Sequence, residues 1–421
     1  MSVVMPPVAA AAVPLPEGSR RERVIRGLLW FLGAFLLISL VRVITGAHDV
    51  DSAGALRGSL VAAIPIALAG LGGLWSERSG VVNIGLEGML VMGALGAGYF
   101  GYNYGVVAGI LGGMLLGLLG GALHALATVI FGVDHIVSGV AINIIAPGLA
   151  AFLAKSWFAA LPGGGPTQSP PLDSPPTITI GPLADFATDL EAKHWFVVSD
   201  LASILGALVR DLSSLTLVAL LLVAGTAWVL WRTSFGLRLR SVGESPSAAE
   251  SLGVNVYRYK IMGVLISGAL AGLGGAYLAI VSSSGYQNGM VNGIGYIGLA
   301  AMIFGNWRPA GMLVGAVLFG YTRTLQLRGG TDSLHALLLA IAVLLAVMAV
   351  LQWRNGKTRQ AVVTVVFGGA FLAWFLTTDS VPPEFTGMAP YLATLFVLVF
   401  ASQKLRMPAA DGQIYRKGSA G

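Results

Sequence analysis

The feature that most constrains this chain is a series of long apolar stretches with almost no charge inside them. About twenty apolar residues in an α-helix cross the hydrocarbon core of a bilayer, and several stretches here reach that length. Only 10% of the 421 residues are charged, against roughly a quarter in soluble domains. In lipid a helix satisfies its own backbone hydrogen bonds, so the sequence predicts an all-α, polytopic helical membrane protein.

The apolar stretches predict about twelve spans, of which the segment 293–306 is short for a crossing. The first span follows a basic cluster and is long for a signal-peptide core, so we expect it to be retained. The predicted spans are 27–45, 59–75, 86–103, 106–131, 136–155, 213–231, 261–281, 293–306, 310–327, 334–352, 361–378 and 388–403.

Lysine and arginine are distributed unevenly around these spans. With the N-terminus inside, 18 of the 25 Lys and Arg residues fall on the cytoplasmic side. This asymmetry is the one described by the positive-inside rule, and it predicts that both termini are cytoplasmic. The distribution of charge thus matters more than the net charge of +6, and we expect no nucleic-acid partner.

The chain contains an internal repeat. Residues 67–73 and 269–275 both read Ala-Leu-Ala-Gly-Leu-Gly-Gly. An odd number of predicted spans separates the copies, so they would cross the membrane in opposite directions. Inverted-topology repeats are typical of transporters, which place their pathway at the repeat interface. Two further pairs of similar segments follow in the same order: 84–89 with 297–302, and 108–117 with 310–320.

The span pattern gives an expected domain organisation. The predicted parts are a cytoplasmic N-terminal tail 1–26; transmembrane residues 27–155 with the first repeat (core 59–131); an external loop 156–212 with an interfacial helix; transmembrane residues 213–327 with a cytoplasmic coupling loop 232–260 and the second repeat; C-terminal spans 328–403, including an extra pair near 334–378; and a cytoplasmic tail 404–421. The external loop is either a solvated segment or a landing surface for an external partner, and the extra pair suits peripheral packing.

Polar residues at or near membrane depth are the candidate pathway residues. Glu87 is the carboxylate expected inside a span, where a charge marks a pathway or a paired site. Alternatively, Glu87 lies near the cytoplasmic end and either pairs with Arg78 or caps a helix. Amide and phenol groups suit a neutral, hydrogen-bonding solute, although each could equally cap or join helices. These residues are Asn83, Asn143, Tyr286, Gln287 and Asn288.

Several patterns argue against chemistry in this chain. There is no cysteine, and His124 and His135 have no second ligand at metal spacing, so neither a metal site nor another cofactor is expected. The sequence Gly-Lys-Thr at 356–358 is not a phosphate-binding P-loop, because Leu351 stands where glycine is required and no strand precedes it. We therefore expect no catalytic residue and no ATP hydrolysis by the chain itself.

Glycines recur every four residues at the end of the predicted first repeat. Such spacing predicts one smooth helix face for close packing against another helix. The glycines are Gly101, Gly105, Gly109, Gly113, Gly117 and Gly121.

The cytoplasmic loop 232–260 carries its own short helix in the prediction. Ser245 fits an N-cap, Pro246 the first helical position, and Gly253 a left-handed stop. Gly243, Glu244, Ala248 and Ala249 complete the set of candidate coupling residues. A short capped helix between two helix ends can dock in a groove of another protein and transmit movement. The alternative is an ordinary basic interfacial loop.

Several of these segments resemble a known family. Residues 236–256 are similar to the coupling-helix segment of ABC-importer permeases in the branched-chain amino acid and monosaccharide permease superfamily. Residues 76–89 and 136–143 are similar to permeases of nucleoside-type importers, and 297–307, 390–395 and 408–410 also fit. His135 stands where glutamine is expected in that pattern, and Ile294 where arginine is expected.

The resemblance implies a set of partners and a location. A second permease subunit, a cytoplasmic ABC ATPase and an external lipid-anchored solute-binding protein would complete such an importer in the cell membrane of a bacterium, surrounded by membrane lipid. The leading hypothesis is a permease subunit that moves a nucleoside or similar neutral polar solute by alternating access, driven by the separate ATPase. Alternatives are an ABC permease for a monosaccharide or branched-chain amino acid, a secondary transporter using Glu87 as its ion site, and a non-transporting scaffold.

Overall fold

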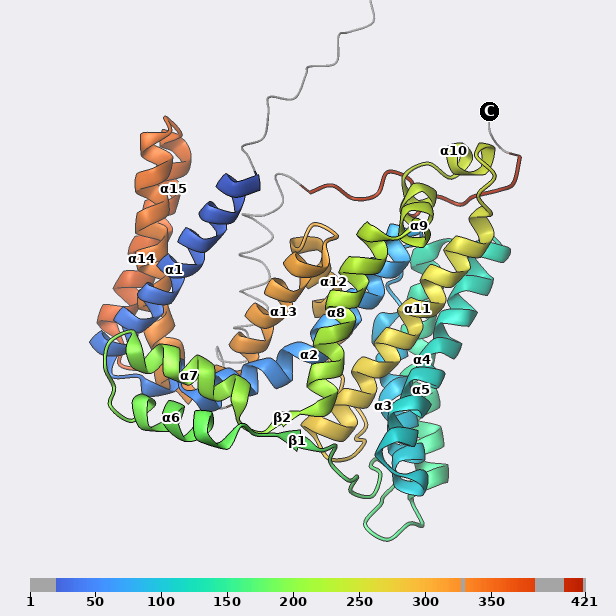
Figure 1. The fold of residues 1–421 in the computed structure, drawn as a ribbon, viewed down its shortest axis with the longest axis horizontal. Helices are drawn as coiled ribbons and strands as arrows, with labels where there is room; N and C mark the ends of the chain where they lie inside the picture. The colour runs from blue at the N-terminus through green and yellow to red at the C-terminus, as the bar shows by residue number, and fades with distance from the viewer. Residues whose placement is uncertain (1–19, 326, 328–329, 383–404, 419–421) are drawn as a thin grey trace, which may run out of the picture.

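The computed structural model describes residues 20–325, 327, 330–382 and 405–418, and these residues are predominantly α-helical (Figure 1). A two-residue antiparallel pair, β1 (Thr177–Ile178) with β2 (Leu212–Ser213), joins the two ends of the stretch that contains α6 and α7. The helices are α1 Arg20–Thr45, α2 Ala53–Arg78, α3 Leu86–Tyr104, α4 Val106–Ala125, α5 His135–Phe158, α6 Gly181–Glu191, α7 Val198–Val209, α8 Ser214–Arg232, α9 Ser234–Glu244, α10 Pro246–Ser251, α11 Val256–Tyr277, α12 Ile294–Phe304, α13 Pro309–Thr324, α14 Gly330–Arg354 and α15 Thr358–Thr377.

Seven helical segments in the described residues are long and apolar enough to cross a membrane. The prediction of a polytopic, all-α membrane protein is therefore confirmed, whereas the number of twelve spans stays a prediction. The difference arises partly because α12, with 11 residues, and α13, with 16, are short for a crossing, and because the predicted span 388–403 lies outside the described residues. The seven segments are His48–Arg78, Val106–Ile130, His135–Phe158, Ser214–Arg232, Val256–Ser282, Thr331–Arg354 and Thr358–Thr377.

Two helices form the centre of the bundle. The apolar windows of α2 and α11 are each 78% buried, against 17% for α15 and 22% for α5. These two central helices carry the identical heptapeptides of the repeat, 67–73 on α2 and 269–275 on α11. A helix that is apolar on all sides belongs in the interior, and here the two most similar segments of the chain are packed together there.

The glycine stripe brings α4 against α11 without intervening side chains. A Cβ added to Gly272 would lie 2.3 Å from the carbonyl oxygen of Gly113, and one added to Gly117 would lie 2.4 Å from that of Gly268. The prediction of a single helix face is wrong for its first two members, because Gly105, at φ +85°, separates α3 from α4. The remaining four glycines lie on α4, and they allow two helix backbones to touch, as small residues do in membrane bundles.

The segment 156–212 is tied to the bundle. It forms two helices, α6 and α7, that pack on each other, where the sequence predicted one interfacial helix. Glu191 accepts a hydrogen bond of 2.8 Å from the backbone nitrogen of Ala53, at the start of α2. On α7, Asp200 pairs with Arg42 of α1 at 3.1 Å, and Arg42 also lies 3.5 Å from Asp51. The insert therefore links α1 to the beginning of α2.

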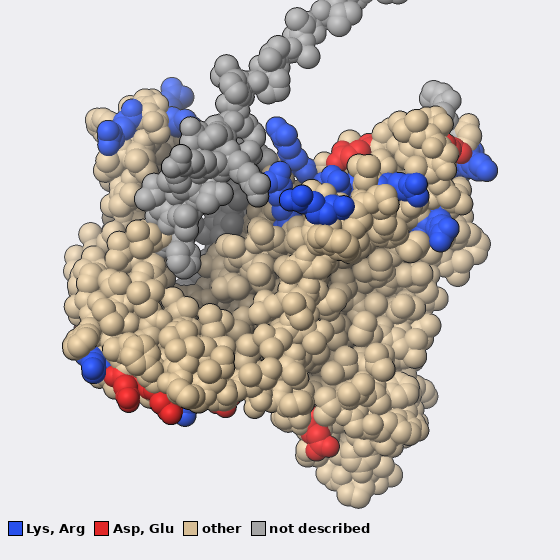
Figure 2. All heavy atoms as spheres, in the orientation of Figure 1, with Lys and Arg blue, Asp and Glu red and all other residues tan. Residues whose placement is uncertain are grey.

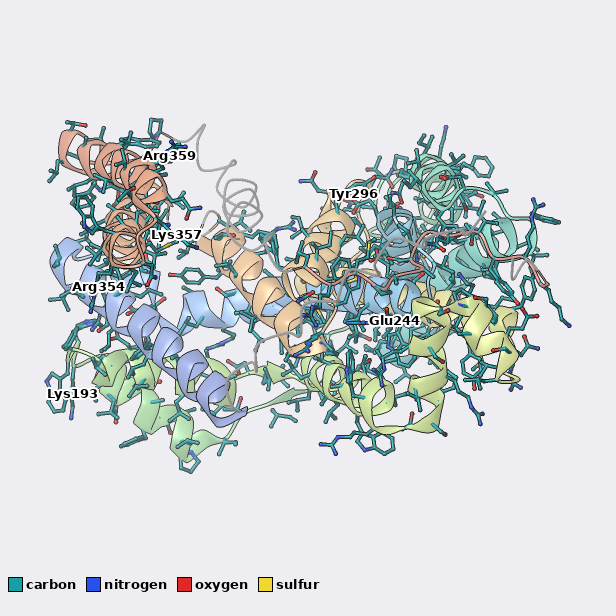
Figure 3. The ribbon with its side chains drawn as sticks, turned by 90° about the horizontal axis from the view of Figure 1, so that it is seen from above. Lys193, Glu244, Tyr296, Arg354, Lys357 and Arg359 are labelled. Atoms are coloured by element: carbon teal, nitrogen blue, oxygen red, sulfur yellow. The ribbon has the colours of Figure 1, made fainter. Side chains whose placement is uncertain are left out.

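The extra pair of helices, α14 and α15, lies at the periphery with α1 (Figure 1). Val41 and Val50 pack with Ala336 and Ala340 of α14 in a small separate cluster. The Gly-Lys-Thr sequence at 356–358 leads from one helix of the pair to the other, and Figure 3 shows the basic side chains around this turn. In the structure this sequence is a helix-to-helix turn.

Candidate functional site

The first turns of α3 and α12 meet, and a carboxylate joins them. Glu87, in the first turn of α3, accepts hydrogen bonds through Oε1 from the Gly293 nitrogen and through Oε2 from the Gly295 nitrogen, both at 2.7 Å. Two free backbone donors and the positive end of the helix dipole make this a favourable place for a carboxylate. Gly295 is required for the close approach, because a Cβ there would lie 2.6 Å from the Glu87 Cα.

Of the alternatives raised for Glu87, capping a helix is therefore correct, and the capped helix belongs to the other repeat. Pairing with Arg78 is wrong. The Arg78 guanidinium donates to the Trp307 carbonyl at 3.1 and 2.7 Å and lies 3.7 Å from Glu244.

Asn143 of α5 caps the start of α3 from the opposite side. Its Oδ1 accepts from the Gly88 nitrogen at 2.8 Å, and its Nδ2 donates to the Ile84 carbonyl and to the Tyr296 hydroxyl, both at 2.9 Å. Tyr296, on α12, is 49% exposed and lies near the rim of the bundle (Figure 3). We call Glu87, Asn143, Tyr296 and the first turns of α3 and α12 the helix-start junction.

Asn83 lies close to this junction but is fully buried. Its Nδ2 donates to the Ser267 hydroxyl of α11 at 2.9 Å, and to the Met89 sulfur at 3.6 Å. In this conformation Asn83 therefore fixes the segment before α3 to the central helix α11.

The other predicted pathway residues form a separate group beyond the end of α11. The Tyr286 hydroxyl donates to Asn288 at 2.6 Å, and the Tyr286 ring is buried. The Tyr286 nitrogen donates to the Ser169 hydroxyl, and the Tyr286 carbonyl accepts from the Ser169 nitrogen. Gln287 pairs with Gln168 in an isolated antiparallel β-bridge. Tyr286, Gln287 and Asn288 thus attach the loop after α11 to the segment that precedes α6.

The two histidines hold a loop in place. His124 Nε2 donates to the Val82 carbonyl at 2.9 Å, while His135 Nδ1 accepts from the Val82 nitrogen at 3.3 Å. A second nitrogen of His124 contacts the Ser138 hydroxyl at 2.9 Å. These contacts position the turn between α2 and α3, and nothing in the spacing of the two histidines had indicated them.

The predicted coupling loop is built from two short helices. Pro246 occupies the first turn of α10, and Gly253 has φ +79° with its nitrogen bonded to the Glu250 carbonyl at 2.8 Å, so both predictions are confirmed. Ser245 lies at the N-cap position, as predicted, but its side chain makes no capping hydrogen bond. The helix α9 was missed, although Thr233 caps it by accepting from the Gly236 nitrogen at 3.1 Å.

The loop is seated directly on the ends of the central helices. Ala249 is 2% exposed and packs with Val242 of α9 and Val256 of α11, whereas Ala248 faces outward. A Cβ on Gly243 would lie 2.3 Å from the Arg78 carbonyl at the end of α2. Helix α10 is therefore connected by direct packing, through α9 and α11, to both central helices.

Most of the chain matches a known protein family. Residues 55–351 match the family model described as the permease component of a branched-chain amino acid transport system. The chain belongs to this permease family. The matched region runs from the start of α2 to the last turn of α14 and includes both the helix-start junction and the coupling loop.

Individual members of this permease family are similar over most of their length. The nucleoside ABC transporter permease NupC of Lactococcus lactis is 33% identical over 85% of this chain and 95% of its own. The guanosine ABC transporter permease NupQ of Bacillus subtilis is 36% identical over 64% and 81%, respectively. A putative glucose ABC transporter permease, TsgC13 of Haloferax volcanii, is 30% identical over 87% and 98%. No solved structure gives a significant match.

Proposed function

We propose that this permease is the transmembrane subunit of an ABC importer, and that a separate cytoplasmic ATPase drives it through alternating access. The observation that carries the proposal is the position of α10: its buried residue Ala249 packs on α9 and α11, while Ala248 is exposed. A motor that pushes on α10 would move α2 and α11, the most buried spans.

We propose a nucleoside as the solute, because the two permeases of highest identity given above are named for nucleosides and guanosine. Amide and phenol groups at the helix-start junction are suited to a neutral solute that forms hydrogen bonds. Glu87 is engaged by two backbone donors, which disfavours its use as the ion site of a secondary transporter. A monosaccharide is the second candidate, favoured by the similarity to the putative glucose permease.

The proposed topology has twelve spans, an inverted repeat and cytoplasmic termini. Two observations support it. The helices α3 and α12, which begin the corresponding parts of the repeat, start against each other at Glu87. In Figure 2 most of the visible Lys and Arg side chains lie along the edge that carries α9 and α10, with a few acidic ones among them, while acidic side chains predominate along the opposite edge. This is the charge asymmetry expected when the α9–α10 end is cytoplasmic.

The proposed partners follow from the exposed faces. Helix α5 leaves large apolar side chains such as Ile144 and Phe152 about 70% exposed, next to Tyr296. We assign this face to the second permease subunit, so that the solute pathway runs between the two subunits past Tyr296 and Asn143. The lipid-anchored binding protein would approach the opposite end from α10, near the segment that Tyr286 holds, and membrane lipid would cover the remaining apolar faces.

Replacing Ala248 with arginine tests the proposed ATPase contact. The side chain is exposed, so the protein should fold, but a long charged group on α10 would obstruct the groove of the motor. We expect solute uptake to fall about tenfold or more, in line with the effects of residues central to an interface. The measurements are co-purification of the ATPase encoded with this chain, and uptake of radiolabelled nucleoside.

The matched control is Ala192→Arg, which adds the same side chain at an exposed position after α6. This variant should behave like the wild type in both assays. If Ala248→Arg also binds the ATPase and transports normally, α10 is not the point at which the motor acts.

A further inference from the structure

The C-terminal tail, residues 405–417, crosses the same end of the bundle as α9 and α10. In Figure 1 it is the red segment that passes these helices. The Arg406 nitrogen donates to Asn306, in the loop between α12 and α13, at 2.7 Å. Further along, the Ala410 nitrogen donates to the Gly243 carbonyl at the end of α9 at 2.9 Å. A single short segment thus joins the second repeat to the coupling loop.

The tail carries a buried acid close to the ends of the central helices. Asp411 is 9% exposed and interacts with Glu77 at the end of α2, which is itself buried and accepts a hydrogen bond of 2.5 Å from Trp307. Lys260, at the start of α11, lies nearby and donates to the Gly80 carbonyl at 2.9 Å. Burial raises the pKa of Asp411 to about 7, although Glu77 and Lys260 both act to lower it. This part of the tail therefore lies against the ends of both central helices, α2 and α11.

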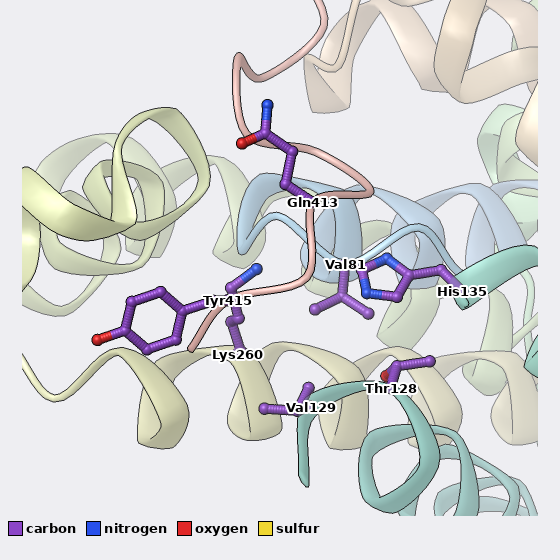
Figure 4. A pocket seen from close by; sticks show the side chains of 7 residues that line it. All are labelled: Val81, Thr128, Val129, His135, Lys260, Gln413 and Tyr415. Atoms are coloured by element: carbon purple, nitrogen blue, oxygen red, sulfur yellow. The ribbon is translucent and has the colours of Figure 1, made fainter. Parts of the chain in front are cut away.

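The end of the tail forms part of the seat of α10. The Tyr415 ring packs edge-on to Tyr257 at 5.2 Å and against the cluster that holds Ala249. Figure 4 shows Gln413 and Tyr415 of the tail beside Lys260 at a small pocket that also includes His135. The underside of α10 is therefore made partly by α9 and α11 and partly by the tail.

The outer side of the tail and α10 exposes large apolar side chains. Met407 is 55% exposed, Ile414 48%, and Leu252, which directly follows α10, 84%. This is the end of the molecule where the Lys and Arg side chains gather, so it lies in water and not in lipid (Figure 2). Exposed apolar groups with a charged rim are typical of a protein-binding surface.

We propose that the tail, residues 405–417, takes part in coupling to the ATPase. It holds α10 against the central helices, and it contacts the ATPase through Met407 and Ile414. The inference rests on the proposed function, because the occupant of this surface is the ATPase that acts on α10. The docking surface would then include the tail as well as α10. Through Asn306, the second repeat would be directly connected to this surface.

Charge substitutions at the exposed side chains test the contact. Met407→Asp and Ile414→Asp place a carboxylate at half-exposed positions of the tail, so the folded protein should persist, and its melting temperature is measured beside binding. We expect ATPase binding to the full chain to weaken about tenfold, as for apolar residues at the centre of an interface. The matched control is Ile178→Asp in β1, which is 47% exposed at the other end of the molecule and should bind normally.

A second variant tests the seat. Tyr415→Ala removes the tail's contact with the α10 cluster, and we expect the amount of nucleoside moved per ATP hydrolysed to fall about tenfold while the ATPase remains bound. If both charge variants bind the ATPase like the wild type, and Tyr415→Ala transports with normal coupling, the inference is wrong. If the wild-type chain itself binds no ATPase, the proposed function fails instead, and the two failures are distinguishable.

Discussion

Replacing Gly272 with valine is expected to prevent the protein from reaching a stable fold. The added Cβ would lie 2.3 Å from the Gly113 carbonyl oxygen and 2.9 Å from the Gly117 Cα, and both atoms are backbone that cannot rotate away. The crossing of α4 and α11 would have to open along its length. Overpacking of this kind costs about 3 kcal/mol or more. Detergent-solubilised protein should be monodisperse for the wild type and largely lost or aggregated for the variant.

The matched control for this prediction is Gly225→Val. Gly225 lies in α8, another apolar span, and a Cβ there has no neighbouring atom within 4 Å. The yield and melting temperature of Gly225→Val should match those of the wild type. Equal stability of the two valine variants would contradict the close crossing of α4 and α11.

Replacing Glu87 with alanine is expected to lower solute uptake about tenfold or more. The substitution leaves the Gly293 and Gly295 nitrogens without their acceptor, and each charge-assisted hydrogen bond is worth about 1.5–3 kcal/mol. The start of α12 would then lose its fixed position against α3, and with it the geometry of Tyr296 beside the proposed pathway. Uptake of radiolabelled nucleoside by reconstituted importer measures the effect.

Glu87→Gln separates the hydrogen bonds from the charge. The amide oxygen can accept from one of the two nitrogens, so this variant should transport at a level between alanine and the wild type. Wild-type uptake by both variants would show that the helix-start junction has no part in transport. Equal loss in both would show that the acceptor geometry is not the reason for the residue.

Local sequence chemistry was sufficient for the parts of the site that depend on neighbouring residues. Pro246 marks the start of α10 because proline fits the first helical turn, and Gly253 follows its end because glycine accepts a positive φ. Both effects act within one turn of the helix. The predicted spans 86–103 and 106–131 already placed a break at Gly105. The prediction of one glycine face was wrong there because it relied on the regular spacing and ignored that break.

Contacts between distant segments could not be foreseen in this way. Asn143 and Tyr296 are 153 positions apart, and Glu87 is 206 from Gly293, so the junction forms only when α3, α5 and α12 pack together. The attachment of the tail through the backbone nitrogens of Arg406 and Ala410 was missed for the same reason. A polar residue in an apolar segment signals that a partner exists, but it does not identify the partner.

The central claim is that a separate ATPase drives this permease, and reconstitution tests it most directly. The chain would be placed in proteoliposomes with the proposed second permease, ATPase and binding protein, and uptake of radiolabelled nucleoside would be followed with and without ATP. The account predicts uptake only when ATP and the ATPase are both present, in the absence of any ion gradient. Accumulation by the chain alone, driven by a proton or sodium gradient without ATP, would contradict it.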